Sequence, residues 1–486
     1  MSARRAGHPA HAREWRGSVP WSSGWSDWLV EAGVLFLLVF TPLAFGTVEP
    51  WSEAIAELVV LGMVVAWLLG MTLSDWELRV ELPPGWLAAS LFLALIFVQA
   101  VPIPTALAHI ISPWTTGFHD QARMYTGAGP SSVPLSLAAH DTWREALKIG
   151  AVAAFFLVCY NVYRTRAQVH RALWTMIAVG AAISVLGIVQ RVTWNGRFYW
   201  IGPEAPHRNA FGPFVNRAHF AGLMVVVVPM ALALWLTSRY TPTRKQLVRT
   251  LRDRLRSWNT SDGGPTTLIP FLVLLMGGAA LVSGTRGGLV ALLVTLLAMT
   301  AAGMRERTGA AAKIAAYGAL VVLAGLWIGS DVVQGTLGRL VEELEQGTES
   351  SRLVIWSDAL GVWRHAPALG TGLATFEAVF PGVRTIMAPV VFTHAESDWV
   401  QLLTDTGLVG LLAVLATLGV IVVSCLRLRT RTRLDILAIG AAVAALGAAS
   451  QGVGNFSFVV LSNLLYVAAA VGVVCPYLRG KAAEHA

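Results

Sequence analysis

The chain has 486 residues and a formal net charge of +8. Hydrophobic residues make up 55% of it, charged residues only 13%, and its mean hydropathy is +0.61. A soluble domain carries about twice that share of charge, so the composition excludes an ordinary soluble enzyme. We predict an all-α, polytopic integral membrane protein, because a helix satisfies its own backbone hydrogen bonds in lipid.

About twelve apolar windows along the chain have the length of a membrane-spanning helix. Glu31 lies in the first window and no small-residue cleavage site follows it, so we expect an uncleaved helix rather than a signal peptide. We divide the chain into a cytoplasmic or interfacial arm (1–28), a transmembrane domain (29–478) and a cytoplasmic tail (479–486). The windows lie at about 29–45, 54–73, 85–101, 146–163, 172–190, 218–238, 266–283, 288–303, 314–330, 398–424, 434–450 and 459–478.

The basic residues favour one orientation of these helices. With both termini in the cytoplasm, 24 of the 36 lysine and arginine residues fall on the inner side and 12 on the outer side. This excess agrees with the rule that cytoplasmic loops retain positive charge. The basic run at 244–256 then lies at the inner membrane surface. Because no set of base-stacking aromatic residues accompanies it, we expect it to bind membrane lipids and no nucleic acid.

Two outer loops are long, 102–145 and 331–397, and a shorter one lies at 192–217. The first is rich in Pro, Ser and Gly, and we expect an irregular cap there. The loop at 331–397 is the largest and lies between the ninth and tenth predicted helices. Loops of this length in a compact protein are usually functional.

The turn Ser283-Gly284-Thr285-Arg286-Gly287-Gly288 places one permanent cation between two apolar windows. A guanidinium keeps its charge, so at membrane depth it costs several kcal/mol unless an anion or water compensates it. The neighbouring glycines let a ligand approach the backbone, whose N–H groups can face an anion. We therefore expect Arg286 to bind an anionic group, with phosphate as the first candidate.

Arginine dominates the basic residues of the outer side. Of the 12 outer basic residues 11 are arginine, which suits bidentate contacts with phosphate oxygens. Four of them lie in one outer segment: Arg191, Arg197, Arg208 and Arg217. A simpler interpretation is that such side chains extend toward lipid headgroups, and for Arg191 and Arg197 we prefer it.

Four segments occur in the order and spacing of the O-antigen ligase and O-antigen polymerase superfamily, which the chain resembles over about residues 200 to 420. The N-terminal half resembles that family in hydropathy alone. The last segment is the most specific of the four. The segments are Gly212-Pro213-Phe214-Val215-Asn216-Arg217-Ala218-His219-Phe220-Ala221-Gly222, the turn from Ser283 to Gly288, Ser351-Arg352-Leu353-Val354-Ile355-Trp356, and His394-Ala395-Glu396-Ser397-Asp398-Trp399 with its continuation to Gly410.

The resemblance implies a polytopic glycosyltransferase of the GT-C type in a bacterial inner membrane, with its active site facing the periplasm. Members take a glycan from undecaprenyl diphosphate and transfer it, with inversion, to a hydroxyl. In ligases the acceptor is lipid A-core, and in polymerases it is another lipid-linked repeat. We favour the ligase reaction because the ordered short motifs resemble those of ligases.

The resemblance also suggests roles for individual residues. Arg286 matches one arginine thought to hold the donor diphosphate, and either Arg208 or Arg217 could be the second. Asn216, Ser283 and Arg352 lie within the matching motifs, and we expect them to support the site.

The large loop departs from the family at one position. Many relatives have His-x-His-Asn where this chain has His394-Ala395-Glu396-Ser397, so a glutamate replaces the second histidine. Either His394 or Glu396 could therefore orient or deprotonate the acceptor hydroxyl. Alternatively, either residue could simply cap the helix that begins near Ser397 or Asp398, and Asp398 is a further supporting candidate.

We expect neither a metal nor another cofactor. Many metal-using glycosyltransferases hold their cation with a close pair of aspartates, and the sequence contains no Asp-x-Asp. A sugar diphosphate already has a good leaving group, so the protein chiefly needs to stabilise charge and orient the acceptor. Cys159, Cys425 and Cys475 lie within or at the inner ends of predicted helices, which suggests neither a disulfide framework nor a metal site.

Two other classes remain open at this stage. A transporter could also have about twelve helices, but it would show repeated halves and paired charges near the midplane. A non-catalytic partner in polysaccharide assembly would need no base near Glu396. The concentration of arginine on the outer side and, above all, the family resemblance favour the enzyme.

Overall fold

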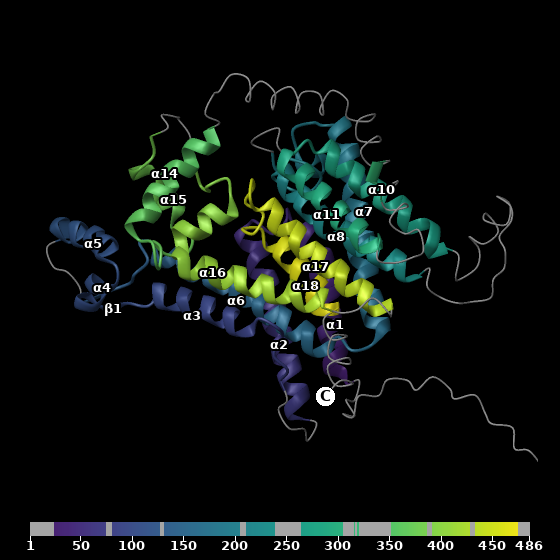
Figure 1. Ribbon diagram of the computed structural model, residues 1–486, viewed down its shortest axis with the longest axis horizontal. Helices are drawn as coiled ribbons and strands as arrows, with labels where there is room; N and C mark the ends of the chain where they lie inside the picture. Colours follow the sequence, from purple (N-terminus) through teal and green to yellow (C-terminus); the bar gives the residue numbers. More distant parts are fainter. Residues whose placement is uncertain are drawn as a thin grey trace, which may run out of the picture.

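We describe the protein from a computed structural model, shown in Figure 1. It describes residues 24–73, 80–126, 131–204, 210–238, 264–304, 315, 318–319, 351–385, 391–427 and 433–474. Most of the predicted N-terminal arm, the C-terminal tail, Arg208, most of the ninth window and the first part of the large loop lie outside these residues.

Eleven of the predicted windows coincide with helices, which confirms a mostly helical, polytopic membrane protein. By length and hydropathy, six of the helices described suffice to cross a membrane: α1, α2, α6, α7, α8 and α16. The other five are shorter apolar helices. The bounds are α1 Trp25–Leu43, α2 Pro50–Thr72, α3 Trp86–Ala100, α6 Ala139–Val162, α7 Arg166–Val192, α8 Arg217–Ser238, α10 Gly264–Val282, α11 Arg286–Met304, α16 Asp398–Leu426, α17 Arg433–Gln451 and α18 Leu461–Val474.

Short elements occupy the predicted outer loops. The first loop differs from the irregular cap that its composition suggested, because α6 begins at Ala139, ahead of the apolar window at 146–163. Asp141, Arg144 and Glu145 lower the hydropathy of its first turns without preventing a helix. The remaining elements are β1 Ile103–Pro104, α4 Thr105–Ile111, α5 Pro113–Thr126, β2 Ser132–Val133, η1 Phe198–Trp200, α14 Ser351–His365, α15 Phe376–Val379 and η2 Phe380–Gly382; β1 pairs antiparallel with β2.

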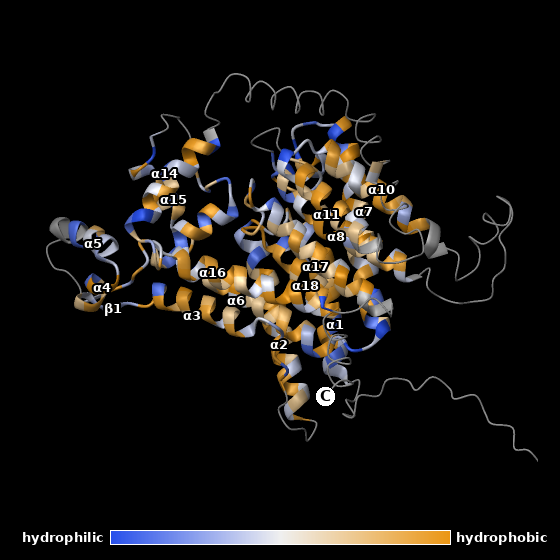
Figure 2. Ribbon diagram, in the orientation of Figure 1, coloured by the Kyte–Doolittle hydropathy of each residue, from blue (hydrophilic) through white to orange (hydrophobic). Residues whose placement is uncertain are grey.

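Helix α8 forms the centre of the bundle. It packs against α7, α10, α11, α17 and α18, and 94% of its apolar window is buried, against 22% for α16. Its sequence is apolar on every side, which is typical of a helix with protein neighbours all around. Figure 2 shows the hydrophobic residues concentrated on these bundled helices and many of the hydrophilic ones in the connecting segments.

Helix α16 is interrupted in its N-terminal part. Gly407 has φ 64° and ψ −168°, a conformation that favours glycine, and the helical hydrogen bonds are broken there. The preceding loop replaces them: the N–H groups of Thr371 and Gly372 donate to the carbonyls of Thr404 and Asp405 at 3.1 and 2.9 Å. The loop from α14 is thereby attached to α16 beside the candidate site.

Gln99 of α3 completes this junction. Its amide nitrogen donates to the carbonyls of Leu369 and Asp405 at 2.6 and 2.9 Å, while its oxygen accepts the N–H of Leu373 at 3.2 Å. One buried side chain therefore satisfies three backbone groups from two different segments, as buried polar groups require.

Candidate active site

A cavity of about 930 Å³ lies between α3, α6 and α16, which run side by side in Figure 1. Its lining changes from polar to apolar along the helices. On α16 the polar residues Asp398, Gln401 and Asp405 come first, and the apolar Leu418 and Ile421 follow several turns later. A ligand with a polar head and an apolar chain matches such a lining.

His394 lies on the polar wall of the cavity, in the segment just before α16. Its Nδ1 lies 3.3 Å from Oε1 of Gln401, and the same oxygen accepts the N–H of Ala395 at 3.3 Å. The imidazole stacks on Phe456, with 4.5 Å between ring centroids, and His219 contacts the same phenyl ring edge-on at 5.2 Å. The imidazole therefore has a defined plane and a defined hydrogen-bond partner.

Burial lowers the pKa of His394 to about 4, because a charged imidazole loses its hydration there. The hydrogen bond with Gln401 acts in the opposite direction, and the positive charge of Lys148 lowers the pKa further. At neutral pH the imidazole is consequently uncharged and can accept a proton.

Glu396 has a different environment from His394 and does not line the cavity. Its carboxylate pairs with Arg352 of α14 at 3.3 Å, and its backbone has the left-handed φ of 56°. Trp356, one turn after Arg352, donates its indole N–H to the carbonyl of Ala395 at 2.9 Å. Helix α14 thus holds the 394–396 segment from the side, and the supporting candidate Arg352 contacts Glu396.

Asp398 connects the start of α16 to the segment between α17 and α18. Its carboxylate accepts the N–H of Ser457 at 2.9 Å and that of Phe458 at 3.1 Å, while its own N–H donates to the carbonyls of Gly452 and Asn455. The residue that caps α16 is Ser397, whose hydroxyl accepts the N–H of Val400 at 3.4 Å. Asp398 is therefore a structural support, and neither His394 nor Glu396 caps the helix.

A group of charges around the buried Lys148 supports the same segment from α6. Lys148, 5% exposed, contacts Glu145 at 2.8 Å and Glu53 at 3.5 Å, and it donates to the carbonyl of Val459 at 3.1 Å. Arg144 pairs with the other oxygen of Glu53 at 2.8 Å. Our sequence interpretation missed this group, although Lys148 inside an apolar window, with Glu53 and Glu145 directly before two windows, is a signal that could have found it.

Asn216 and Arg217 stand at the first turn of α8. The side chain of Asn216 accepts the N–H of Ala218 at 2.9 Å, so it satisfies a free N–H group of that turn, and it also lines the cavity. The preceding turn is held by Phe211 and Phe214, which are buried. Arg217 is half-buried and is the next residue in the chain after Asn216, which lines the cavity.

Arg286 is the first residue of α11, after a turn in which Gly284 has φ 69°. Ser283 is buried, and its hydroxyl donates to the carbonyl of Ala280 at 2.6 Å, so it stabilises the turn. A Cβ at Gly287 would overlap with the side chain of Asn455, and one at Gly288 would overlap with Ala221. The two glycines thus allow α11 to start in close contact with α8 and with the 455–458 segment.

The first turns of α8 and α11 consequently meet, and each helix begins with an arginine: Arg217 and Arg286. Helix N-termini carry a partial positive charge and free N–H groups, so two of them with two guanidinium groups form a favourable place for an anion. The third candidate, Arg208, lies outside the described residues. Within the described ranges, no group of three His, Cys, Asp or Glu residues is arranged to hold a metal ion.

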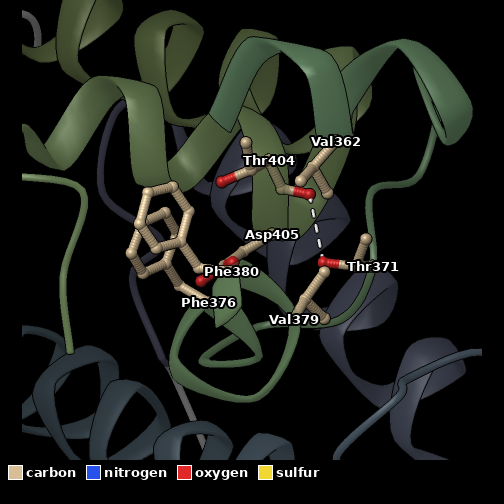
Figure 3. Close-up of a pocket in the computed structure, with 7 residues that line it drawn as sticks. All are labelled: Val362, Thr371, Phe376, Val379, Phe380, Thr404 and Asp405. Atoms are coloured by element: carbon tan, nitrogen blue, oxygen red, sulfur yellow. Dashed lines mark hydrogen bonds between the residues drawn. The ribbon is translucent and has the colours of Figure 1, made fainter. Parts of the chain in front are cut away.

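A second, much smaller cavity lies behind Asp405 (Figure 3). Its volume of about 10 Å³ holds no more than one water molecule. Phe376 and Phe380 line it together with Thr371, whose hydroxyl donates to the carbonyl of Thr404 at 3.4 Å. It is a packing gap at the loop junction rather than a substrate site.

Residues 271–415 match the model of a family described as O-antigen ligase. This match supports the resemblance of the chain to the O-antigen ligase superfamily. The match includes the Arg286 turn, Arg352, His394 and the interrupted part of α16, and so covers much of the candidate site. No curated protein shows significant similarity to the chain.

Proposed function

We propose that the protein is an inverting glycosyltransferase that moves a glycan from undecaprenyl diphosphate to a hydroxyl of lipid A-core, at the periplasmic face of a bacterial inner membrane. One observation carries this proposal most directly. A neutral imidazole, His394, lies on the polar wall of a cavity whose other part is apolar and lies among membrane helices. That arrangement suits a substrate with a lipid chain and a sugar head.

The donor diphosphate is placed at the adjoining first turns of α8 and α11. Arg286 and Arg217 supply two guanidinium groups there, and Asn216, the residue before Arg217, lines the cavity. The arginines stabilise the charge that develops on the leaving diphosphate, which removes the need for a metal ion. The adjacency of the two helix starts favours Arg217 as the second arginine.

His394 is the better candidate for the base, and Glu396 supports it. Glu396 pairs with Arg352 and is absent from the cavity wall, whereas His394 lines it. In the transfer, the acceptor oxygen forms a bond with the anomeric carbon while the bond from that carbon to the diphosphate breaks. The hydroxyl proton moves to the imidazole, and the diphosphate leaves with the bonding electron pair. Attack opposite the leaving group inverts the anomeric centre.

Repeat-unit polymerisation is the second candidate, since the same base and diphosphate site would serve a lipid-linked acceptor. The two reactions differ in the glycan profile of a deletion strain. Loss of all capping of lipid A-core identifies the ligase, and caps limited to a single repeat identify the polymerase. A profile unchanged by the deletion, in a strain without a second such gene, would refute both.

A complemented strain tests the base. His394→Asn should restore less than about one hundredth of the capping rate, because a general base contributes about 10²–10⁴-fold. Glu396→Gln should retain a larger share, since it loses an ion pair with Arg352 rather than the base. Equal rates in His394→Asn and the wild type would remove His394 from the mechanism.

A further inference from the structure

The orientation of the Gln401 amide follows from its backbone neighbour. The N–H of Ala395 points at Oε1 of Gln401 at 3.3 Å, and a backbone N–H can only donate. The atom facing Ala395 must therefore be the amide oxygen. Since the same oxygen lies 3.3 Å from Nδ1 of His394, Nδ1 must carry the proton of the neutral imidazole.

The other ring nitrogen of His394 is then the basic one. A neutral imidazole has one N–H and one lone pair, so a proton on Nδ1 leaves the lone pair on Nε2. Within the part of the chain that the structure describes, the imidazole of His394 makes its hydrogen bond through Nδ1. Stacking on Phe456 fixes the plane of the ring and with it the direction of the Nε2 lone pair.

We propose that Gln401 is a positioning residue that sets the tautomer of His394, with the N–H of Ala395 setting the orientation of Gln401. The catalytic consequence rests on the proposed function, because it assumes that Nε2 accepts the proton of the acceptor hydroxyl. The tautomer itself is independent of that assumption. Gln401 thus has the role that an orienting partner of a catalytic histidine has in other enzymes.

Two substitutions separate this role from simple packing. Gln401→Met keeps the length of the side chain but removes the acceptor, so neither tautomer is selected. Gln401→Glu keeps the acceptor and adds a charge, so it should raise the pKa of His394 by about 1–3 units. Gln99→Met is the matched control, because Gln99 is a buried glutamine whose hydrogen bonds all go to backbone groups.

The expected pKa change takes into account the other groups around the imidazole. These are Lys148 and Glu145 of α6, Glu53 of α2, His219 of α8, Asp398 and Asp405 of α16, and the Arg352–Glu396 pair. Lys148 is already neutralised by Glu145 and Glu53, and Arg352 by Glu396. A carboxylate at position 401 would be the charge nearest to Nδ1.

The direct experiment is 15N NMR on the full-length protein in lipid, with labelled histidine and His394→Asn to assign the signal. Protonated and unprotonated ring nitrogens give separate signals, so the tautomer is read without any substrate. We expect Nδ1–H in the wild type and in Gln99→Met, and a mixture of tautomers in Gln401→Met. An Nε2–H form in the wild type, or an unchanged signal in Gln401→Met, would overturn the inference.

Transfer rates then distinguish this inference from the proposed function. Gln401→Met should lower kcat about 10- to 100-fold, less than complete loss of the base, and Gln401→Glu should move the acid limb of the pH profile upward. Gln99→Met should reduce thermal stability without moving that limb. If the tautomers are as expected and His394→Asn is fully active, the tautomer assignment stands and the base of the proposed function is wrong.

Discussion

Replacing Asp398 by alanine should destabilise the protein rather than remove a catalytic group. The carboxylate accepts the N–H groups of Ser457 and Phe458 at 2.9 and 3.1 Å, and its residue is only 7% exposed. A buried N–H group left without an acceptor costs about 1–3 kcal/mol, so leaving both unpaired costs about 2–6 kcal/mol.

Asp398→Asn and Asp358→Ala provide the comparison. The asparagine keeps one acceptor oxygen and should cost about half as much as the alanine. Asp358 also accepts a backbone N–H, that of Thr385 at 2.7 Å, but at an exposed position where water can replace it. Asp358→Ala should therefore cost no more than about 1 kcal/mol.

The assay is thermal unfolding of detergent-solubilised protein, followed by transfer activity per folded molecule. We expect the melting temperature of Asp398→Ala to lie far below that of Asp398→Asn, and that of Asp398→Asn to lie below the wild type. Total transfer activity should fall in proportion to the folded fraction, so activity per folded molecule should stay unchanged. An Asp398→Ala protein that melts like the wild type but does not transfer glycan would refute this argument. Asp398 would then act on the substrate from the cavity wall.

Two further predictions concern the diphosphate site. Arg286→Ala should lower transfer about 10²–10³-fold. Arg286→Lys should also be severely impaired, because lysine keeps the charge but loses the two parallel hydrogen bonds of the guanidinium. Near-normal transfer by Arg286→Lys, measured per folded protein, would exclude bidentate binding of the diphosphate by Arg286. Transfer in vitro should persist in excess chelator, because arginines take the place of a cation; loss in EDTA with rescue by magnesium or manganese would contradict this.

The helices were predictable from the sequence because the bilayer imposes their length and hydropathy. Each window that falls in the described part of the chain corresponds to a helix, from α1 to α18. The start of α6 was not predictable in this way. Its first turns carry Asp141, Arg144 and Glu145. Arg144 pairs with Glu53 of α2 and Glu145 with Lys148 of α6, and the sequence pattern does not show these pairings.

The motifs located the candidate site but could not choose between neighbouring residues. His394 and Glu396 are two positions apart, and which side chain meets the cavity depends on the left-handed backbone at Glu396 and on its pairing with Arg352. The pairing partner comes from α14, 44 residues away in the sequence. Gln401 belongs to the most specific motif, yet the orientation of its amide depends on the backbone N–H of Ala395. A pattern of residue types does not reveal such a contact.

The segment between α17 and α18 explains why these features come together. Charged groups among apolar helices are expensive unless every one of them is satisfied, and this segment satisfies several. Its N–H groups bind Asp398, and its carbonyl at Val459 binds Lys148.

The same segment reaches both parts of the candidate site. Phe456 supports His394, and Asn455 packs against Gly287 beside Arg286. The base and the diphosphate site therefore share one support. A shift of that segment, residues 452–460, would move the imidazole of His394 relative to the arginines. The distance between the proton acceptor and the leaving group therefore depends on these nine residues, although they need not touch the reacting atoms of the substrate.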